Sequence, residues 1–255
     1  GKSCEFYFVR AEAIRNNTID LRKNLQYLQQ HHPSVIARRH VTFKDAMSCR
    51  LVEKYCAVSH RWESPEEPDT EDVQLKALRT FLNDDPRGQQ IEYVWFDYLC
   101  MAQGKALTEE QLAEFKLMLQ NINMLYLGCT VLILLDISYL SRFWTQFEAW
   151  LSFMTGSKLG LQSAPEEERR CVIKPIHNAT EKTADQLIDL WADKDAKQAK
   201  ATLGAPDVTV TNTSDKVEQL KKVLGFDARV SELFEENPRL AEERLSFTIT
   251  IKEDE

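Results

Sequence analysis

The run TVLILLD at residues 130–136 constrains the fold of this chain more than any other segment. It is apolar on both faces, whereas a strand with one solvent-exposed face alternates apolar and polar residues. Such a strand is typical of a parallel sheet that helices cover on both sides. The rest of the chain must therefore supply the covering helices.

Strand-like and helix-like segments do alternate along the chain. The alternation predicts an α/β fold, a flavodoxin-like doubly wound parallel sheet of about five strands, with extensions at both ends of the chain. We expect the first four strands to be parallel to one another. The predicted strands are residues 54–60, 91–99, 130–136, 170–177 and 207–212, and the predicted helices are residues 72–82, 108–128, 143–154, 183–203 and 214–225.

The chain divides into three predicted regions. Residues 1–50 are expected to form an N-terminal helical extension, because residues 11–30 repeat apolar side chains at helical spacing and Pro33 ends the segment. Residues 51–178 are expected to form the α/β core.

The third region, residues 179–255, is expected to be a C-terminal α/β extension that packs on the core. Its last segment, RLSFTITIKEDE at residues 244–255, alternates as an edge strand does. Loop-like breaks occur at residues 63–70 and 155–169.

Composition excludes several classes of function. The net charge of −8 argues against nucleic acid as the main partner, because phosphate binding needs an excess of Lys and Arg. No apolar run reaches the roughly 20 residues of a membrane helix, so no membrane partner is expected. The six cysteines form no C-x-x-C pair, which favours reduced thiols and a cytoplasmic location. The five histidines lack ligand spacing, so no metal site is predicted.

The chain also lacks the glycine-rich motifs of nucleotide binding. It contains only eight glycines, and neither G-x-G-x-x-G nor G-x-x-x-x-G-K-[ST] occurs. No G-x-S-x-G marks a nucleophilic serine. A bound phosphate would therefore have to contact Arg side chains or helix N-termini.

Polar and aromatic residues gather directly after the predicted strands. In open α/β sheets the ligand site lies beyond the carboxyl ends of the strands. We therefore expect the residues that follow the first three strands to converge on one cleft. The four strand exits read SHRWE from residue 59, DYLCMAQG from residue 97, DISYLSRFW from residue 136 and HNAT from residue 177.

Three of these segments resemble a known family. The segment VLILLDISYLSRFWTQFEAW contains W-x-x-x-E, from Trp144 to Glu148, after a buried strand and a serine-bearing turn. It resembles the third core strand and following helix of the Toll/interleukin-1 receptor (TIR) domain. YCAVSHRWE and YVWFDYLCMAQG resemble the first two TIR strands and their exits, and they are also similar to the heterokaryon-incompatibility (HET) domain. The resemblance covers about residues 52–155.

The TIR resemblance implies an enzymatic activity and a catalytic residue. Enzymatic TIR domains hydrolyse the bond between nicotinamide and ribose in NAD+, and some cyclise the remaining ADP-ribose. By this resemblance Glu148 is the catalytic carboxylate, NAD+ is the substrate, and no cofactor is required. We also expect a homo-oligomer on activation, in immune or cell-death signalling.

The residues around Glu148 are consistent with that role. On a helical wheel Glu148 lies at the edge of the core-facing arc of its helix, beside Trp144 and Leu151. A carboxylate in such half-buried, aromatic surroundings resists ionisation. When nicotinamide leaves, the ribose gains oxocarbenium character. A carboxylate can stabilise that charge, hold the ribose hydroxyls or trap the sugar covalently. The arc consists of Phe143, Phe147, Trp150, Leu151 and Met154.

Three further residues are candidates for nucleotide binding. Arg61 could bind a pyrophosphate, or it could pair with the acidic residues 63–71. Trp62 could stack on nicotinamide or adenine, although an aromatic residue near a strand end is more often part of the core. Trp144 could form a wall of the pocket or simply pack.

The other candidates are the polar residues at the two strand ends. Asp97 could bind the ribose or cap the next turn. Ser59 and His60 belong to the same candidate nucleotide-binding set, although the structural interpretation, polar caps on a strand end, is favoured for both.

Two other functions fit the sequence. A nucleoside deoxyribosyltransferase also uses a Glu on a flavodoxin-like sheet. A non-catalytic TIR/HET-like signalling module would act by self-association, and Trp144 and Glu148 would then shape a loop for protein contact.

Overall fold

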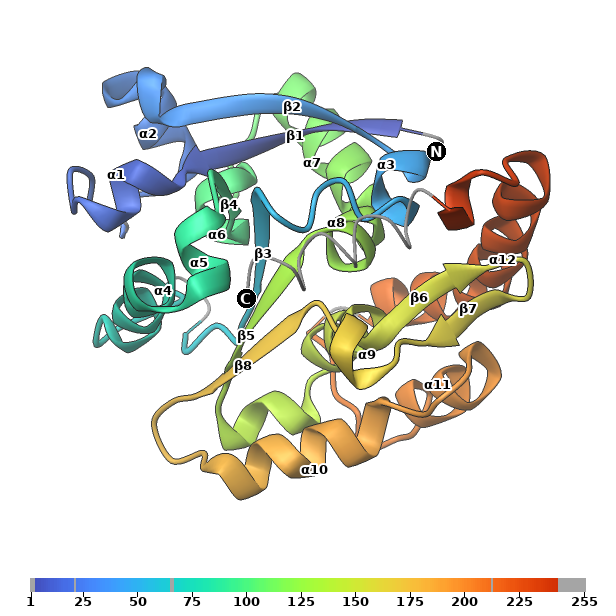
Figure 1. Ribbon diagram of the computed structural model, residues 1–255. Coiled ribbons are helices and arrows are strands. Elements are labelled where there is room, and N and C mark those ends of the chain that lie inside the picture. Colours follow the sequence, from blue (N-terminus) through green and yellow to red (C-terminus); the bar gives the residue numbers. More distant parts are fainter. Residues whose placement is uncertain (1–2, 21, 65–66, 212, 243–255) are drawn as a thin grey trace.

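The structure, a computed structural model, describes residues 3–20, 22–64, 67–211 and 213–242. Its centre is a six-stranded sheet of order β2-β1-β4-β3-β5-β8 (Figure 1). The four strands β4, β3, β5 and β8 are parallel, and β1 is antiparallel to both of its neighbours. The strands are β1 (Ser3–Arg10), β2 (Ile36–Thr42), β3 (Tyr55–Ser59), β4 (Tyr93–Trp95), β5 (Thr130–Leu135) and β8 (Cys171–Pro175).

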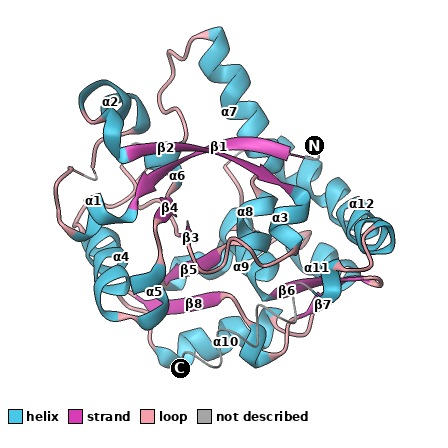
Figure 2. Cartoon of the chain, turned by 45° about the horizontal axis from the view of Figure 1, so that its top comes forward, coloured by secondary structure: helices cyan, strands magenta, loops and turns pink. Residues whose placement is uncertain are grey.

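The four parallel strands confirm the parallel arrangement that the apolar runs predict. All six residues of β5 are buried, so both faces of the sheet are covered at this strand. Figure 2 shows α4 and α5 on one side of the parallel strands and α8 and α9 on the other. The chain therefore has an α/β fold with a mostly parallel central sheet and flanking helices.

The two strands that follow β3 in the chain lie on opposite sides of it. From β3 the chain passes through α4 (Val73–Asp84) and α5 (Pro86–Gln90) to β4 on one side. It then returns through α6 (Asp97–Cys100), α7 (Glu109–Asn121) and α8 (Asn123–Gly128) to β5 on the other side. The strand order thus reverses between β3 and β5, and such a switch point is where open α/β sheets bind ligands.

The prediction of an N-terminal helical extension for residues 1–50 is wrong. This region supplies β1 and β2, which extend the sheet beyond β4. In β1, Cys4, Phe6 and Phe8 are buried on alternate positions, the pattern of a strand with one buried face. The helix expected over residues 11–30 is interrupted. The helices of this region are α1 (Ala11–Arg15), α2 (Leu25–His31), the 3₁₀ helix η1 (Pro33–Val35) and α3 (Phe43–Met47).

The described part of the C-terminal region is helical rather than α/β. The strand expected at residues 207–212 is limited to one bridge between Thr209 and Arg142. The edge strand predicted at residues 244–255 lies outside the described residues. The helices are α10 (Glu181–Trp191), α11 (Ala196–Leu203) and α12 (Thr213–Glu236).

The break predicted at residues 155–169 contains a hairpin. Strands β6 (Met154–Ser157) and β7 (Gly160–Ser163) pair antiparallel and pack against α12. The remaining elements are the 3₁₀ helix η2 (Ile137–Ser141), α9 (Phe143–Phe153) and the 3₁₀ helix η3 (Glu166–Glu168). No helix in the described part of the chain is long and apolar enough to cross a membrane.

A buried arginine ties the helices to the sheet. The Arg170 guanidinium, just before β8, donates to the carbonyls of Tyr126 (2.8 Å), Cys129 (3.2 Å), Leu151 (3.0 Å) and Met154 (2.7 Å). Two of these carbonyls belong to the last turns of α8 and α9, where the helix dipole favours a positive charge. Arg170 thereby gives charge-assisted donors to four buried carbonyls, of which the Leu151 carbonyl also accepts from the Met154 N–H.

Replacing Arg170 with Leu is expected to destabilise the fold by roughly 3 kcal/mol or more, because it removes the charge-assisted hydrogen bonds to four backbone carbonyls. Urea denaturation measures the change in the free energy of unfolding. Arg87→Leu is the control, since Arg87 is exposed and donates one hydrogen bond to the Arg169 carbonyl. It should cost less than about 1 kcal/mol. Equal losses in the two variants would contradict the role given to Arg170.

Candidate functional site

The residues that follow β3, β4 and β5 meet at the carboxyl edge of the sheet in two hydrogen-bonded groups. One group joins Ser59 to Glu148, and the other joins His60 and Trp62 to Asp97. These residues are supplied by the end of β3, the first turn of α6 and the middle of α9. The structure therefore brings together five of the seven candidate residues through direct side-chain contacts.

Glu148 is buried more deeply than the sequence indicates. The helical wheel places its side chain at the edge of the apolar arc, but only 9% of its surface is exposed. Every residue of α9 except Trp144 is buried, because α8, α10 and α11 enclose the helix together with the sheet. One of the enclosing contacts is a hydrogen bond from Trp150 Nε1 to the Lys194 carbonyl (2.9 Å).

Hydroxyl groups surround the Glu148 carboxyl. Ser59 Oγ donates to Glu148 Oε2 at 2.6 Å, and the Tyr139 hydroxyl lies 2.6 Å from Ser59 Oγ. Since Ser59 has a single hydroxyl proton, Tyr139 is the donor in the second bond. Burial raises the pKa of Tyr139 and of Tyr126, which also bonds Glu148, well above the ordinary tyrosine value. Both phenols therefore remain proton donors.

The pKa of Glu148 is raised from 4.5 to about 8. Burial is the main cause, because it penalises the charged form, and the nearby Asp97 charge adds to the effect. The hydrogen bonds from Ser59 and Tyr126 oppose it, because they favour the carboxylate. Near neutral pH the neutral acid is therefore the main form of Glu148 in this conformation.

Asp97 is the acceptor at the centre of the second group. Its Oδ1 accepts from His60 Nε2 (2.9 Å) and from the Tyr98 backbone N–H (2.6 Å), and its Oδ2 accepts from Trp62 Nε1 (2.7 Å). The cap that the sequence offered as one alternative for Asp97 is not present, because the N-cap of α6 is Phe96 and no side-chain capping bond occurs there. Asp97 thus holds the β3 exit against the start of α6.

His60 is held from both sides of its ring. Its Nδ1 lies 2.7 Å from Gln74 Oε1, and its Nε2 lies 2.9 Å from Asp97 Oδ1. Gln74 Nε2 in turn donates to the carbonyls of Arg61 (3.0 Å) and Pro68 (2.8 Å). His60 therefore links the start of α4 to the start of α6.

Arg61 pairs with a carboxylate that the sequence analysis did not single out. Its Nε and Nη2 lie 2.8 and 2.7 Å from Asp136 Oδ2. Asp136 follows β5 directly, so this ion pair also bridges the switch point between β3 and β5. One of the two alternatives for Arg61 was an ion pair with the acidic residues 63–71, and the carboxylate it pairs with is Asp136 instead. Glu63 accepts from Thr70 and lies 2.8 Å from His177 Nε2.

The two tryptophans have different surroundings. Trp62 is half-buried, and its ring meets Tyr98 edge-on at a centroid distance of 5.6 Å. Trp144 is half-buried and packs against Phe143 and Phe147. The contacts of Trp144 are those of a packing residue, and they do not connect it to either hydrogen-bonded group.

Besides Asp136, sequence reasoning missed three other neighbours of the candidate residues. Tyr126 and Tyr139 occur in apolar stretches, where an aromatic residue is interpreted as part of the hydrophobic core. Gln74 carried a signal, because it lies on the stripe of α4 that also contains Leu78 and Phe81. A polar residue on a core-facing stripe indicates a buried hydrogen-bond network.

Known proteins offer no further guide to the site. Comparisons with protein-family models, with curated proteins and with solved structures give no match. The TIR and HET resemblance therefore rests on the three quoted segments alone. Within the described residues, no group of three or more His, Cys, Asp or Glu side chains could hold a metal ion.

Glu148→Gln should stabilise the fold increasingly as the pH rises. The folded-state pKa of Glu148 lies above its unfolded value, so its contribution is complete below pH 4.5 and lost as the pH passes about 8. Gln keeps an acceptor for Ser59 and does not titrate. We expect the variant to gain about 1 kcal/mol or more over the parent between about pH 5 and pH 9.

The control for this comparison is Glu181→Gln, because Glu181 is exposed at the start of α10. Thermal unfolding across the pH range measures both differences. A loss of stability in Glu148→Gln relative to the parent at high pH would contradict the raised pKa of Glu148.

Proposed function

We propose that the chain is a TIR-like NAD+ glycohydrolase with a flavodoxin-like core, in which Glu148 is the catalytic carboxylate. The observation that carries the proposal is the position of Glu148 at the switch point. Its carboxyl bonds Ser59 at the end of β3, while its own helix follows β5. A single carboxyl of strongly raised pKa at the ligand-binding edge of an α/β sheet is typical of a catalytic group.

The chemistry requires only a well-placed negative charge. Loss of nicotinamide leaves oxocarbenium character on the ribose. Glu148 stabilises it once the site has opened, because exposure of the carboxyl removes the burial that keeps it neutral, and water completes the hydrolysis. The pyridinium is already a good leaving group, so the reaction needs no cofactor, and NAD+ is the substrate. The other proposed nucleotide-binding residues are Ser59, His60, Arg61, Trp62, Asp97 and Trp144.

The burial of Glu148 implies that substrate binding rearranges the site. In the closed arrangement Ser59 and Tyr139 cover the carboxyl, and Arg61 is held by Asp136. A pyrophosphate would have to replace Asp136 on Arg61, and the ribose would have to replace Ser59 on Glu148. We propose that self-association in the cytoplasm brings about this opening. The six free cysteines fit a reducing compartment.

A second candidate is a non-catalytic signalling module that works by self-association. The internal hydrogen bonds of Glu148 favour it, because a carboxyl satisfied by Ser59 serves structure as well as chemistry. Ile137, the second residue after β5, is 52% exposed and offers an apolar contact at the same edge of the sheet. In this alternative Glu148 positions the segment that presents Ile137.

Nicotinamide release from NAD+ by concentrated protein distinguishes the two functions. Glu148→Gln removes the charge needed in the transition state and is expected to lower the rate on the order of 100-fold or more. Glu148→Asp should lower it nearly as much, because the shorter side chain withdraws the carboxylate from the ribose. Glu181→Gln, a change of the same type on the exposed surface, should leave the rate unchanged.

Other results of this assay would favour one of the alternative functions. No nicotinamide release under crowded conditions would contradict the enzyme proposal and favour the signalling module. Base release from a deoxynucleoside, with none from NAD+, would assign the deoxyribosyltransferase activity. Full activity in Glu148→Gln would mean that another residue supplies the charge.

A further inference from the structure

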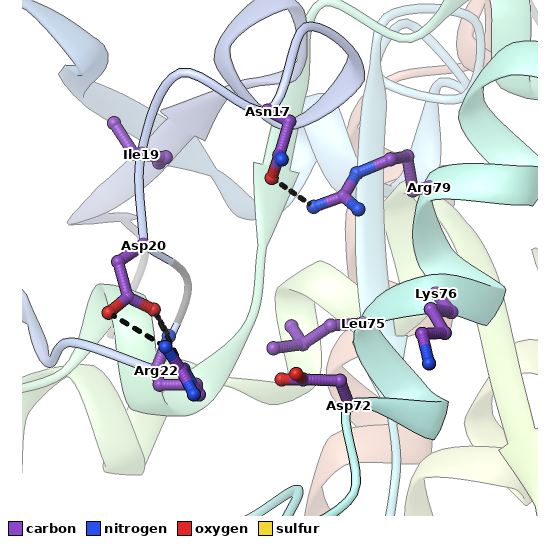
Figure 3. A pocket seen from close by; sticks show the side chains of 8 residues that line it. All are labelled: Asn17, Ile19, Asp20, Arg22, Asp72, Leu75, Lys76 and Arg79. Atoms are coloured by element: carbon purple, nitrogen blue, oxygen red, sulfur yellow. Dashed lines mark hydrogen bonds and ion pairs between the residues drawn. The ribbon is translucent and has the colours of Figure 1, made fainter.

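A pocket of about 250 Å³ opens on the side of α4 (Figure 3). Its lining does not include Glu148, Ser59 or Asp97, and this inference does not rest on the proposed function. Figure 3 shows the segment after α1 facing the first turns of α4 across the pocket, with the Leu75 side chain between them. Three cations and two carboxylates line it, so the pocket has a net positive charge on a protein of net charge −8.

Two of the cations are already held in position. Arg79 donates from Nε to the Ile14 carbonyl (3.1 Å) and from Nη2 to Asn17 Oδ1 (2.7 Å). Arg22 pairs with Asp20 through Nε at 3.0 Å. These contacts leave further N–H groups on each guanidinium for a ligand. Fixed donors lower the entropic cost of binding an anion.

Lys76 supplies a third cation, and Asp72 supplies an acceptor. Among the described residues, neither side chain has a hydrogen-bond partner. Lys76 lies one turn after Asp72 on the same helix, and both line the pocket. A pocket that offers several free N–H donors and one free carboxylate matches a ligand with an anionic group and hydroxyl groups.

The backbone of α4 is not the anion receptor. Asp69 Oδ2 accepts from the Leu75 N–H at 2.7 Å, and Asp69 also bonds the N–H groups of Val73 and Gln74. The anion must therefore be bound by side chains. Asp69 is only 2% exposed, and its Oδ1 has no hydrogen-bond partner among the described residues.

Asp69 lines an adjoining small cavity. This cavity shares Arg22 and Leu75 with the larger pocket and has about 10 Å³, room for roughly one water molecule. Asp69 does not line the larger pocket itself, so Asp20 and Asp72 are its carboxylates.

We propose that this pocket binds a small phosphorylated polyol of pentose phosphate size. Lys76 and Arg79 bind the phosphate, and Asp72 accepts hydrogen bonds from the sugar hydroxyls. Phosphate prefers guanidinium and ammonium donors, and hydroxyl groups prefer carboxylate acceptors. The volume is below the roughly 300–1,000 Å³ of pockets for drug-sized ligands, which suits a single sugar phosphate.

Calorimetric titration of the full chain with ribose 5-phosphate, inorganic phosphate and ribose tests the proposal. Ribose 5-phosphate should bind most tightly and ribose most weakly. Lys76→Gln should weaken ribose 5-phosphate about tenfold, the loss of one charge-assisted hydrogen bond. Asp72→Asn should weaken ribose 5-phosphate without weakening inorganic phosphate, because only the sugar uses the carboxylate.

Two controls place the binding in this pocket. Lys116→Gln changes an exposed lysine in the middle of helix α7 and should leave the affinity unchanged. Glu181→Gln changes an exposed carboxylate at the start of α10 and should also leave it unchanged. Absence of binding at millimolar ribose 5-phosphate, or equal affinity in the parent and Lys76→Gln, would overturn the proposal.

Discussion

The hydrogen bond between Ser59 Oγ and Glu148 Oε2 spans the point at which the strand order reverses. Ser59 ends β3, and Glu148 lies on the helix that follows β5, so the bond bridges the switch point. A carboxyl that is 9% exposed is stable there only while hydroxyl donors and a proton satisfy it. The rest of the carboxyl edge is built around this requirement.

Buried backbone carbonyls elsewhere in the fold also receive hydrogen bonds from side chains, in this case from arginines. Arg170 satisfies carbonyls at the ends of α8 and α9, and Arg15 does the same for the carbonyls of Leu82, Gly88 and Ile91. Each arginine replaces several lost water contacts with a fixed set of donors. Arginine side chains thus fix the helix ends, and the candidate site is held by hydrogen bonds among hydroxyl, imidazole and carboxyl groups.

The sequence predicted what depends on local pattern and missed what depends on distant packing. The four parallel strands were visible as apolar runs. The pairing of β1 with β2 was not predicted. The β2 sequence, IARRHVT, has the basic residues of an exposed segment, and it forms a strand by pairing with β1. The position of Glu148 at a strand exit was predictable from W-x-x-x-E. Its depth was not, since it depends on contacts such as Trp150 with Lys194 in a C-terminal region of unassigned role.

The central claim is that Glu148 is a buried, neutral acid held at the switch point. A ¹³C NMR titration of the Glu148 side-chain carboxyl, assigned by comparison with Glu148→Gln, measures this directly. The structure predicts a titration midpoint near pH 8. A midpoint near the ordinary value of 4.5 would show that the carboxyl is solvated and would contradict the account.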